Sequence, residues 1–277
     1  MVHYIYKRQS DPDTAWRLET GPLPDTRTGI AAGSYIARAV SEVAHEFVVT
    51  AASTGNPGPS ALLASATATY FFGGDNAAMT AQGGGQALTP VAAAPSHAAG
   101  YVTPAVGRNG LRSPVDDADV LSVACVFRAP ERALLVGTQG DGDSYGWSLA
   151  TFNGRRYFQI RAALLPEYQQ EPTNPAATFL AEVLVLDRPG GAARRVAGNA
   201  AGTDEVSELT GPSWAAPGQV NKVSLGVANG GGGAFDAAAA DFAALAIWSG
   251  TALTVAQATA VIGELRSACA SRGITVR

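Results

Sequence analysis

The side chains best suited to bind a ligand gather in residues 140–161, where aromatic, arginine and aspartate residues follow one another closely. A saccharide site uses this combination, because pyranose CH groups pack on aromatic rings while charged and polar groups bind the hydroxyls. Asn153-Gly154 predicts a two-residue hairpin turn, since both positions tolerate positive φ. The hairpin and its preceding loop would bring these side chains together. The candidate ligand-binding residues here are Asp141, Asp143, Tyr145, Trp147, Arg155, Tyr157 and Arg161.

Two tryptophans have competing interpretations. Trp147 shares its strand face with Leu149, so it can equally belong to the core of a sheet. Trp214, in the loop-like segment "GPSWAAPG", is a further ligand candidate. It can also pack against an N-terminal arm or a partner subunit. Both residues therefore enter the predicted saccharide site with a structural role as the alternative.

Two aspartates suggest a metal site. Asp141 and Asp143 carry the oxygen ligands that Ca²⁺ prefers, and their D-x-D spacing also occurs in the EF-hand loop, although the rest of that motif is missing. A solvated turn is the alternative. Cysteines and histidines are not clustered as a zinc site requires. The sequence thus suggests Ca²⁺ and no other cofactor.

The sequence lacks the usual catalytic constellations. A retaining glycosidase needs two carboxylates about 5 Å apart, and Glu182 stands alone in its predicted strand. Asp204, Glu205 and Glu208 fall in a segment that resembles a loop. The sequence has no G-x-S-x-G motif, which would supply the nucleophilic serine of a triad with one of the histidines. The glycine runs lack the Gly-Lys-Ser/Thr of a phosphate-binding loop. We therefore expect a protein that is not an enzyme.

Charge is sparse on this chain. Charged residues make up 15% of 277 residues and the net charge is −4, so a nucleic-acid partner, which requires a basic surface, is not expected. No apolar run reaches about 18 residues, so no membrane span is expected. The N-terminus lacks the apolar region of a signal peptide, which predicts synthesis in a cytoplasm. Cys125 and Cys269 are expected to be reduced core thiols.

Short strands with frequent turns dominate the chain from residue 46 onward. This pattern favours an all-β antiparallel β-sandwich over alternating strands and helices. Within the return strand of the hairpin, alternation separates an apolar face with Phe158 from a more polar, outward face with Tyr157. The clearest strand-like runs are residues 120–129, 132–139, 145–163, 178–187, 220–229 and 242–248.

The N-terminal part has a different composition. Residues 1–45 are polar and contain turn signals such as "DPDT" and "GPLPDTRTG". The apolar spacing within residues 34–47 fits one face of a short helix, with Ser34 as its N-cap. We therefore predict an extended N-terminal arm with a short helix, followed by a sandwich domain over residues 46–277.

The chain is predicted to close on an amphipathic helix over residues 254–272. Thr254 is a natural N-cap, and Gln257 three positions later completes a capping box. Gly273 can adopt the left-handed conformation that ends a helix. We expect the helix to cover a face or an edge of a sheet. Its apolar stripe consists of Val255, Ala258, Ile262, Leu265 and Cys269.

The order of these segments resembles a known family of folds. The final strand and helix, "IWSGTALTVAQATAVIGELRSACASRGI", resemble the end of laminin-G-like or concanavalin A-like jelly rolls. "LSVACVFRA" resembles their early core strand, and "LLVGTQGDGDSYGWSLATFNGRRYFQI" their central hairpin. The resemblance covers about residues 100–277, and laminin-G-like domains often hold Ca²⁺ on a rim loop. It implies a jelly-roll sandwich with an N-terminal arm and a C-terminal helix.

Alanine-rich domains of this kind are similar to phage virion proteins such as tail fibres, spikes and capsid decorations. The resemblance implies a virion protein that displays a lectin-like sandwich for adhesion to host-surface glycans. Its partners would be other virion proteins, bound through the arm, and further copies of itself, with a trimer favoured. A decoration or assembly protein without a ligand is the alternative, and a glycan-cleaving enzyme is a third hypothesis.

Overall fold

The computed structural model describes most of the chain beyond residue 60. Side chains and backbone are described for residues 61–74, 79–82, 86–107, 109–138, 146–160, 177–198, 204–208, 221–227 and 239–277. The backbone alone is described for residues 3–8, 17–20, 33–39, 46–51, 145, 161–162, 165–173 and 209–210. The chain divides into two compact units, Met1–Gly58 and Pro59–Arg277.

The N-terminal unit contains a four-stranded antiparallel sheet of order β2-β1-β3-β4. This differs from the extended arm with a short helix that the sequence predicted. A short apolar run fits the helical and the strand period alike, and here the backbone of β3 pairs with β1 and β4 on its two sides. Since β4 belongs to this sheet, the sandwich begins after it and not at residue 46. The strands are β1 (His3–Arg8), β2 (Arg17–Thr20), β3 (Gly33–Ala39) and β4 (Glu46–Ala51).

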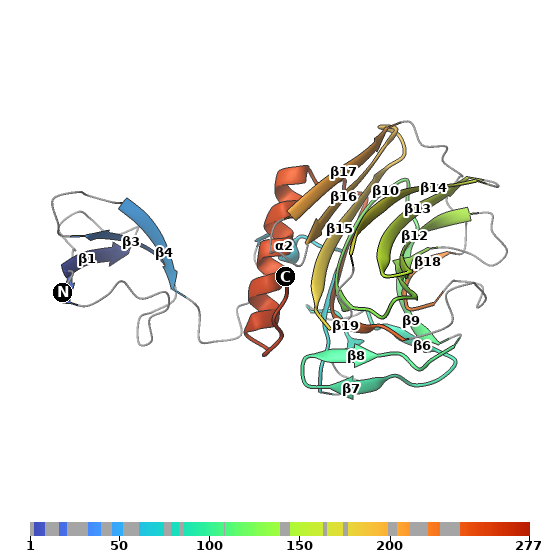
Figure 1. The fold of residues 1–277 in the computed structure, drawn as a ribbon, viewed down its shortest axis with the longest axis horizontal. Helices are drawn as coiled ribbons and strands as arrows, with labels where there is room; N and C mark the ends of the chain where they lie inside the picture. Colours follow the sequence, from blue (N-terminus) through green and yellow to red (C-terminus); the bar gives the residue numbers. More distant parts are fainter. Residues whose placement is uncertain are drawn as a thin grey trace. The chain divides into compact units, whose positions relative to one another are not determined.

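The second unit is a sandwich of two antiparallel sheets, which confirms the predicted fold class (Figure 1). One sheet carries α2 on its outer face, and we call it the helix-covered sheet. Its strands, in spatial order, are β17 (Asp204–Thr210), β16 (Ala192–Gly198), β15 (Leu180–Asp187), β10 (Val120–Arg128), β19 (Asp241–Ser249), β8 (Tyr101–Thr103) and β7 (Ser96–Ala98), with β5 (Ala68–Phe71) also paired to β19.

The opposite sheet contains the predicted hairpin, and we call it the hairpin sheet. Its turn residues Asn153 and Gly154 have φ values of 53° and 72°, so the Asn-Gly signal was correct and both positions use the left-handed region. The strands, in spatial order, are β14 (Leu165–Thr173), β13 (Arg155–Ala162), β12 (Tyr145–Phe152), β11 (Ala133–Gly137), β18 (Lys222–Leu225), β9 (Gly110–Asp116) and β6 (Thr89–Val91).

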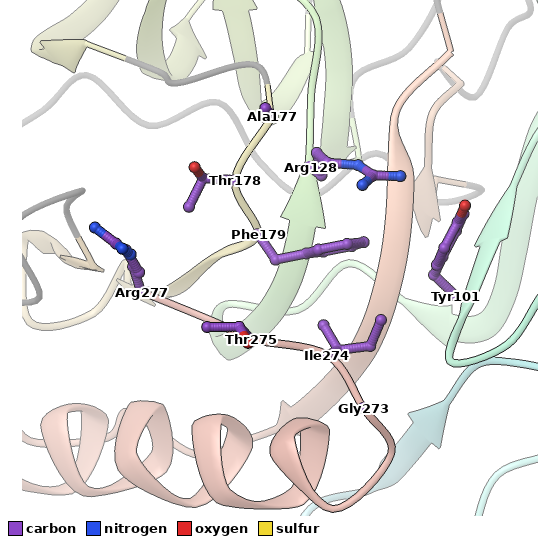
Figure 2. A pocket seen from close by; sticks show the side chains of 9 residues that line it. All are labelled: Tyr101, Arg128, Ala177, Thr178, Phe179, Gly273, Ile274, Thr275 and Arg277. Carbon is purple, nitrogen blue, oxygen red and sulfur yellow. The ribbon is translucent and has the colours of Figure 1, made fainter.

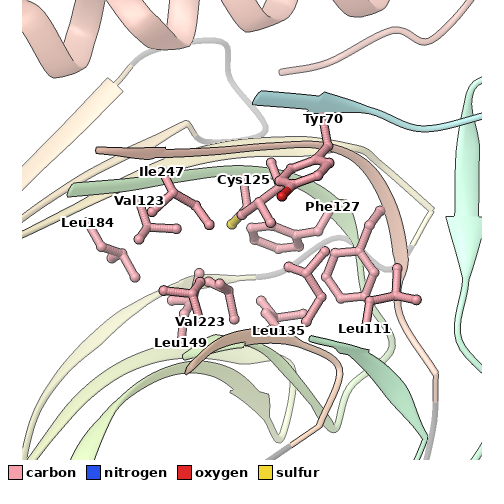
Figure 3. Packing of buried hydrophobic residues seen from close by; sticks show 14 of the residues in the cluster. Tyr70, Leu111, Val123, Cys125, Phe127, Leu135, Leu149, Leu184, Val223 and Ile247 are labelled. Carbon is pink, nitrogen blue, oxygen red and sulfur yellow. The ribbon is translucent and has the colours of Figure 1, made fainter. Parts of the chain in front are cut away.

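The central strands of the helix-covered sheet, β15, β10 and β19, are buried on both faces, which explains the largely apolar sequence of β10. Val123, Cys125 and Phe127 point into the core between the sheets (Figure 3). Ala124 and Val126 belong to a second cluster, beneath α2. Strands buried on both faces read as continuous apolar runs because neither set of alternating side chains meets water.

The C-terminal helix α2 (Val255–Ala270) matches the prediction closely. Thr254 accepts a hydrogen bond from the Gln257 backbone N–H, and the Gln257 side chain accepts one from the Thr254 backbone N–H. Four residues of the predicted stripe are buried, whereas Val255 is 37% exposed. The helix covers a sheet face, and α1 (Ala61–Ala64) adds Leu63 to the same cluster. Among the residues described, neither helix is long and apolar enough to cross a membrane.

The two cysteines are free and buried, as predicted. They lie on opposite sides of the helix-covered sheet, because Cys125 belongs to the core between the sheets and Cys269 to the cluster under α2. Burial raises the pKa of both thiols, that of Cys269 to about 12. Both side chains therefore act as small apolar core residues.

Candidate functional site

The hairpin divides its predicted site residues between the core and the surface. The Trp147 side chain is 1% exposed and meets Phe158 edge to face, with ring centroids 6.4 Å apart. Its Nε1–H donates to Asp117 Oδ1 at 3.3 Å. The indole is therefore a core group of the sandwich and offers no face on which a sugar could pack.

Arg155 and Tyr157 lie on the outer face of the same hairpin, as the alternation predicted. Tyr157 contacts Phe152 edge to face at 6.5 Å, and the Arg132 guanidinium lies 5.4 Å from the Phe152 ring centroid. Phe152 is 38% exposed. We call these four residues, Arg132, Phe152, Arg155 and Tyr157, the hairpin cluster. It presents aromatic rings and guanidinium groups on one surface.

For the other predicted site residues the structure describes the backbone alone or nothing. The backbone of Tyr145 pairs with Ala162, and that of Arg161 with Gly146. Asp141, Asp143 and Trp214 lie outside the described residues, so the Ca²⁺ site stays a prediction. Within the described part of the chain, no three His, Cys, Asp or Glu side chains lie close enough together to hold a metal ion.

A pocket of about 380 Å³ opens where β10 ends, beside β8 and the segment that follows α2. Figure 2 shows the Arg128 guanidinium above the Phe179 ring and directed toward Tyr101. We call this site the arginine pocket. Its volume falls in the range of pockets that bind small molecules. The lining residues are Tyr101, Arg128, Ala177, Thr178, Phe179, Gly273, Ile274, Thr275 and Arg277.

Strand pairing fixes the arginine of this pocket. Arg128 at the end of β10 lies opposite Asp241 at the start of β19. Its Nε and Nη2 donate to Asp241 Oδ2 at 2.8 and 2.7 Å, and Thr103 Oγ1 donates to Asp241 Oδ1 at 2.5 Å. Burial alone would lower the pKa of Arg128, but the hydrogen bond and charge of Asp241 outweigh it and raise the pKa. The guanidinium is thus a charged, oriented donor.

Two aromatic rings lie beside the same guanidinium, which is positioned over both. The Arg128 Cζ atom lies 5.1 Å from the Tyr101 ring centroid and 4.7 Å from that of Phe179. The two rings are themselves 5.6 Å apart, with an interplanar angle of 52°. Cations over aromatic faces are attracted by the ring quadrupole. Phe179 is buried and serves as a support, whereas Tyr101 and Arg128 are partly exposed and can meet a ligand.

The wall opposite the arginine is the segment after α2. Gly273 turns the chain with a φ of 79°, and the Ile274 N–H donates to Cys269 O at 3.0 Å. Val276 forms a parallel bridge with Phe179, and the Arg277 N–H donates to Phe179 O at 2.9 Å. These backbone bonds place the exposed Thr275 in the lining of the pocket.

Sequence reasoning missed this pocket. Its central ion pair joins residues 113 positions apart, and neither belongs to a recognisable motif. The one local signal is that Arg128 and Asp241 stand at the ends of strongly apolar strands. A charged residue at such a place can form an ion pair across a strand pair, but the sequence does not say which two strands are neighbours.

Glu182, the isolated carboxylate of β15, is bound by two arginines inside the sandwich. Arg195 donates to it through Nε at 2.8 Å and Nη2 at 2.9 Å, and Arg156 Nη1 also donates to it. All three side chains are fully buried. Burial alone would raise the pKa of Glu182, but the charges of Arg156 and Arg195 outweigh it and lower the pKa. Glu182 is therefore an ionised structural group and not a proton donor.

Comparisons with known proteins support the fold. The botulinum neurotoxin serotype G binding domain matches with a TM-score of 0.52 and 10% identity, over 72% of this chain and 50% of that chain. The receptor binding domain of botulinum neurotoxin mosaic serotype C/D matches with a TM-score of 0.50 and 8% identity, over 73% and 51%. This chain thus spans about half the length of the neurotoxin domains that it matches.

A carbohydrate-binding module is more distant. The Ruminococcus gnavus IT-sialidase CBM40 bound to α2,3-sialyllactose gives a TM-score of 0.39 and 14% identity, over 52% of this chain and 83% of that chain, so no argument rests on it. No protein-family model and no curated protein matches the sequence significantly. The likenesses establish the β-sandwich fold, and the question of a ligand rests on the chemistry of the site.

Proposed function

We propose that the sandwich is a saccharide-binding domain and that the arginine pocket is its main site. The observation that carries the proposal is the oriented guanidinium of Arg128, fixed by Asp241 and partly exposed beside Tyr101 in a pocket of about 380 Å³. A partly exposed aromatic ring, a fixed donor and the nearby hydroxyls of Thr178 and Thr275 are the groups that a sugar needs.

The hairpin cluster is proposed as a second contact surface for the same class of ligand. Tyr157 and Phe152 offer ring surface, and Arg132 and Arg155 offer hydrogen-bond donors. This keeps Arg155 and Tyr157 in the role that the sequence suggested. Tyr145, Arg161, Asp141, Asp143 and Trp214 remain proposed ligand contacts, whereas Trp147 is assigned to the core.

A glycan array tests the proposal. Thr275→Trp should fill the mouth of the pocket and reduce binding at least tenfold, because Thr275 is exposed and lines it. Thr259→Trp, on the exposed side of α2, is the matched control and should bind as the wild type does. The loss of glycan binding in Tyr157→Ala measures how much the hairpin cluster contributes to binding. If no glycan binds the wild type, or if the Thr275 and Thr259 variants bind equally, the proposed site is incorrect.

We further propose that the protein is a phage virion component, a homo-oligomer that displays the sandwich for adhesion to host-surface glycan. The division into two compact units supports this, because one unit can attach to other virion proteins while the other meets the ligand. Antibody labelling of purified particles tests the location, and unlabelled particles would contradict it. If the protein is a decoration protein without a ligand, the antibody would label the particles and the protein would bind no glycan on the array.

A further inference from the structure

The charge of the arginine pocket differs from that of the chain as a whole. The chain has 23 acidic and 19 basic residues and a net charge of −4. The residues that line the pocket include two arginines, Arg128 and Arg277, and no aspartate or glutamate. Among the lining side chains only the two guanidinium groups are charged, and positive charge in a cleft concentrates anions.

Resting on the proposed saccharide site, we infer that its ligand carries a negatively charged oxyanion, a carboxylate or a sulfate ester. The polar side chains that line the pocket are two guanidinium groups, which only donate, and the hydroxyls of Tyr101, Thr178 and Thr275. A neutral sugar hydroxyl both donates and accepts, and among these side chains only the three hydroxyls can accept from it. An oxyanion only accepts, which matches this donor-rich lining.

The carboxylate of Asp241, which binds the guanidinium of Arg128, is engaged in contacts of its own. Both oxygens of Asp241 already accept hydrogen bonds, Oδ2 from Arg128 and Oδ1 from Thr103. Asp241 receives the Nε and Nη2 atoms of Arg128, so Nη1 lies on the other side of the guanidinium from this contact. Asp241 occupies this planar donor pair, so a ligand would meet the Nη1 side of the guanidinium. Asp241 therefore orients the guanidinium and balances its charge, and Arg277 places a further guanidinium at the pocket, outside this ion pair.

A matched pair of substitutions isolates the charge. Thr275→Glu and Thr275→Gln place side chains of equal size at the same exposed position of the pocket, and they differ by one negative charge. A charge within several ångströms of the bound anion should weaken binding roughly tenfold. We therefore expect Thr275→Glu to bind acidic glycans roughly tenfold more weakly than Thr275→Gln, and we expect no effect of Thr259→Glu on the far part of α2.

The ligands are taken from an array that holds neutral, carboxylated and sulfated glycans. Binding to acidic glycans that is lost on methyl esterification identifies a carboxylate, and binding lost on desulfation identifies a sulfate. Raising NaCl from 0.05 to 0.5 M should weaken the binding of carboxylated and sulfated glycans alike, because salt screens exposed charges. The inference fails if neutral glycans bind as tightly as acidic ones, or if Thr275→Glu and Thr275→Gln behave alike. If no glycan binds at all, the proposed saccharide site itself fails.

Discussion

Replacing Glu182 by glutamine tests the interpretation of the buried Arg156–Glu182–Arg195 cluster. The substitution keeps the shape of the side chain and removes the charge that both guanidinium groups share. Glu182 accepts three hydrogen bonds from them, at a place where none of the three side chains meets solvent. Removing one partner of a buried ion pair destabilises proteins by about 3–5 kcal/mol, because the remaining charge is desolvated without compensation.

For a unit of this size, each kcal/mol shifts the melting temperature by about 2–4 °C, so Glu182→Gln should lower Tm by roughly 6–20 °C. Calorimetry measures this directly. The control is Glu208→Gln, because Arg194 Nε lies 3.3 Å from Glu208 Oε2 and the two side chains are 28% and 41% exposed. Surface pairs contribute about 0–1 kcal/mol. If both variants melt within about 2 °C of the wild type, the buried charges do not need Glu182 and the reasoning is refuted.

Three further predictions follow from local features. The lowered pKa of Glu182 gives stability that is present above the unfolded pKa of about 4.3 and is lost as pH falls toward the folded pKa. In urea unfolding between pH 6 and 3, the free energy of unfolding should therefore decline more steeply with falling pH for wild type than for Glu182→Gln. Equal slopes for the two proteins would contradict this prediction. Thr254→Ala removes the capping box and should destabilise by about 1 kcal/mol in calorimetry, whereas Thr259→Ala, inside the helix, should not; equal effects would show that the cap is unimportant. If Asp141 binds Ca²⁺, titration calorimetry should detect binding to the wild type and not to Asp141→Asn, and no heat with the wild type would remove the metal site.

Local signals account for the features that the sequence predicted correctly. The capping box of α2 involves residues three positions apart, and the hairpin turn needs only Asn153 and Gly154. Strand alternation placed Tyr157 outward and Phe158 inward. Each of these follows from the backbone geometry of a few neighbouring residues.

Features that depend on which strands meet were not accessible in this way. The partner of Arg156 is Glu182 on the opposite sheet, and the partner of Arg128 is Asp241, 113 positions along the chain. No local pattern specifies such a pair. The short apolar run of the N-terminal strand β3 fits both the helical and the strand period, and only pairing with β1 and β4 decides between them.

The most direct test of the saccharide site is an NMR titration of the ¹⁵N-labelled protein with the tightest glycan from the array. The account predicts saturable shifts at the amides of Tyr101, Phe179 and Thr275 and at the Arg128 side-chain Nε–H, all around the arginine pocket. Smaller shifts at Tyr157 would report the second surface. Shifts that spare the pocket, or their absence at saturating glycan, would contradict the account.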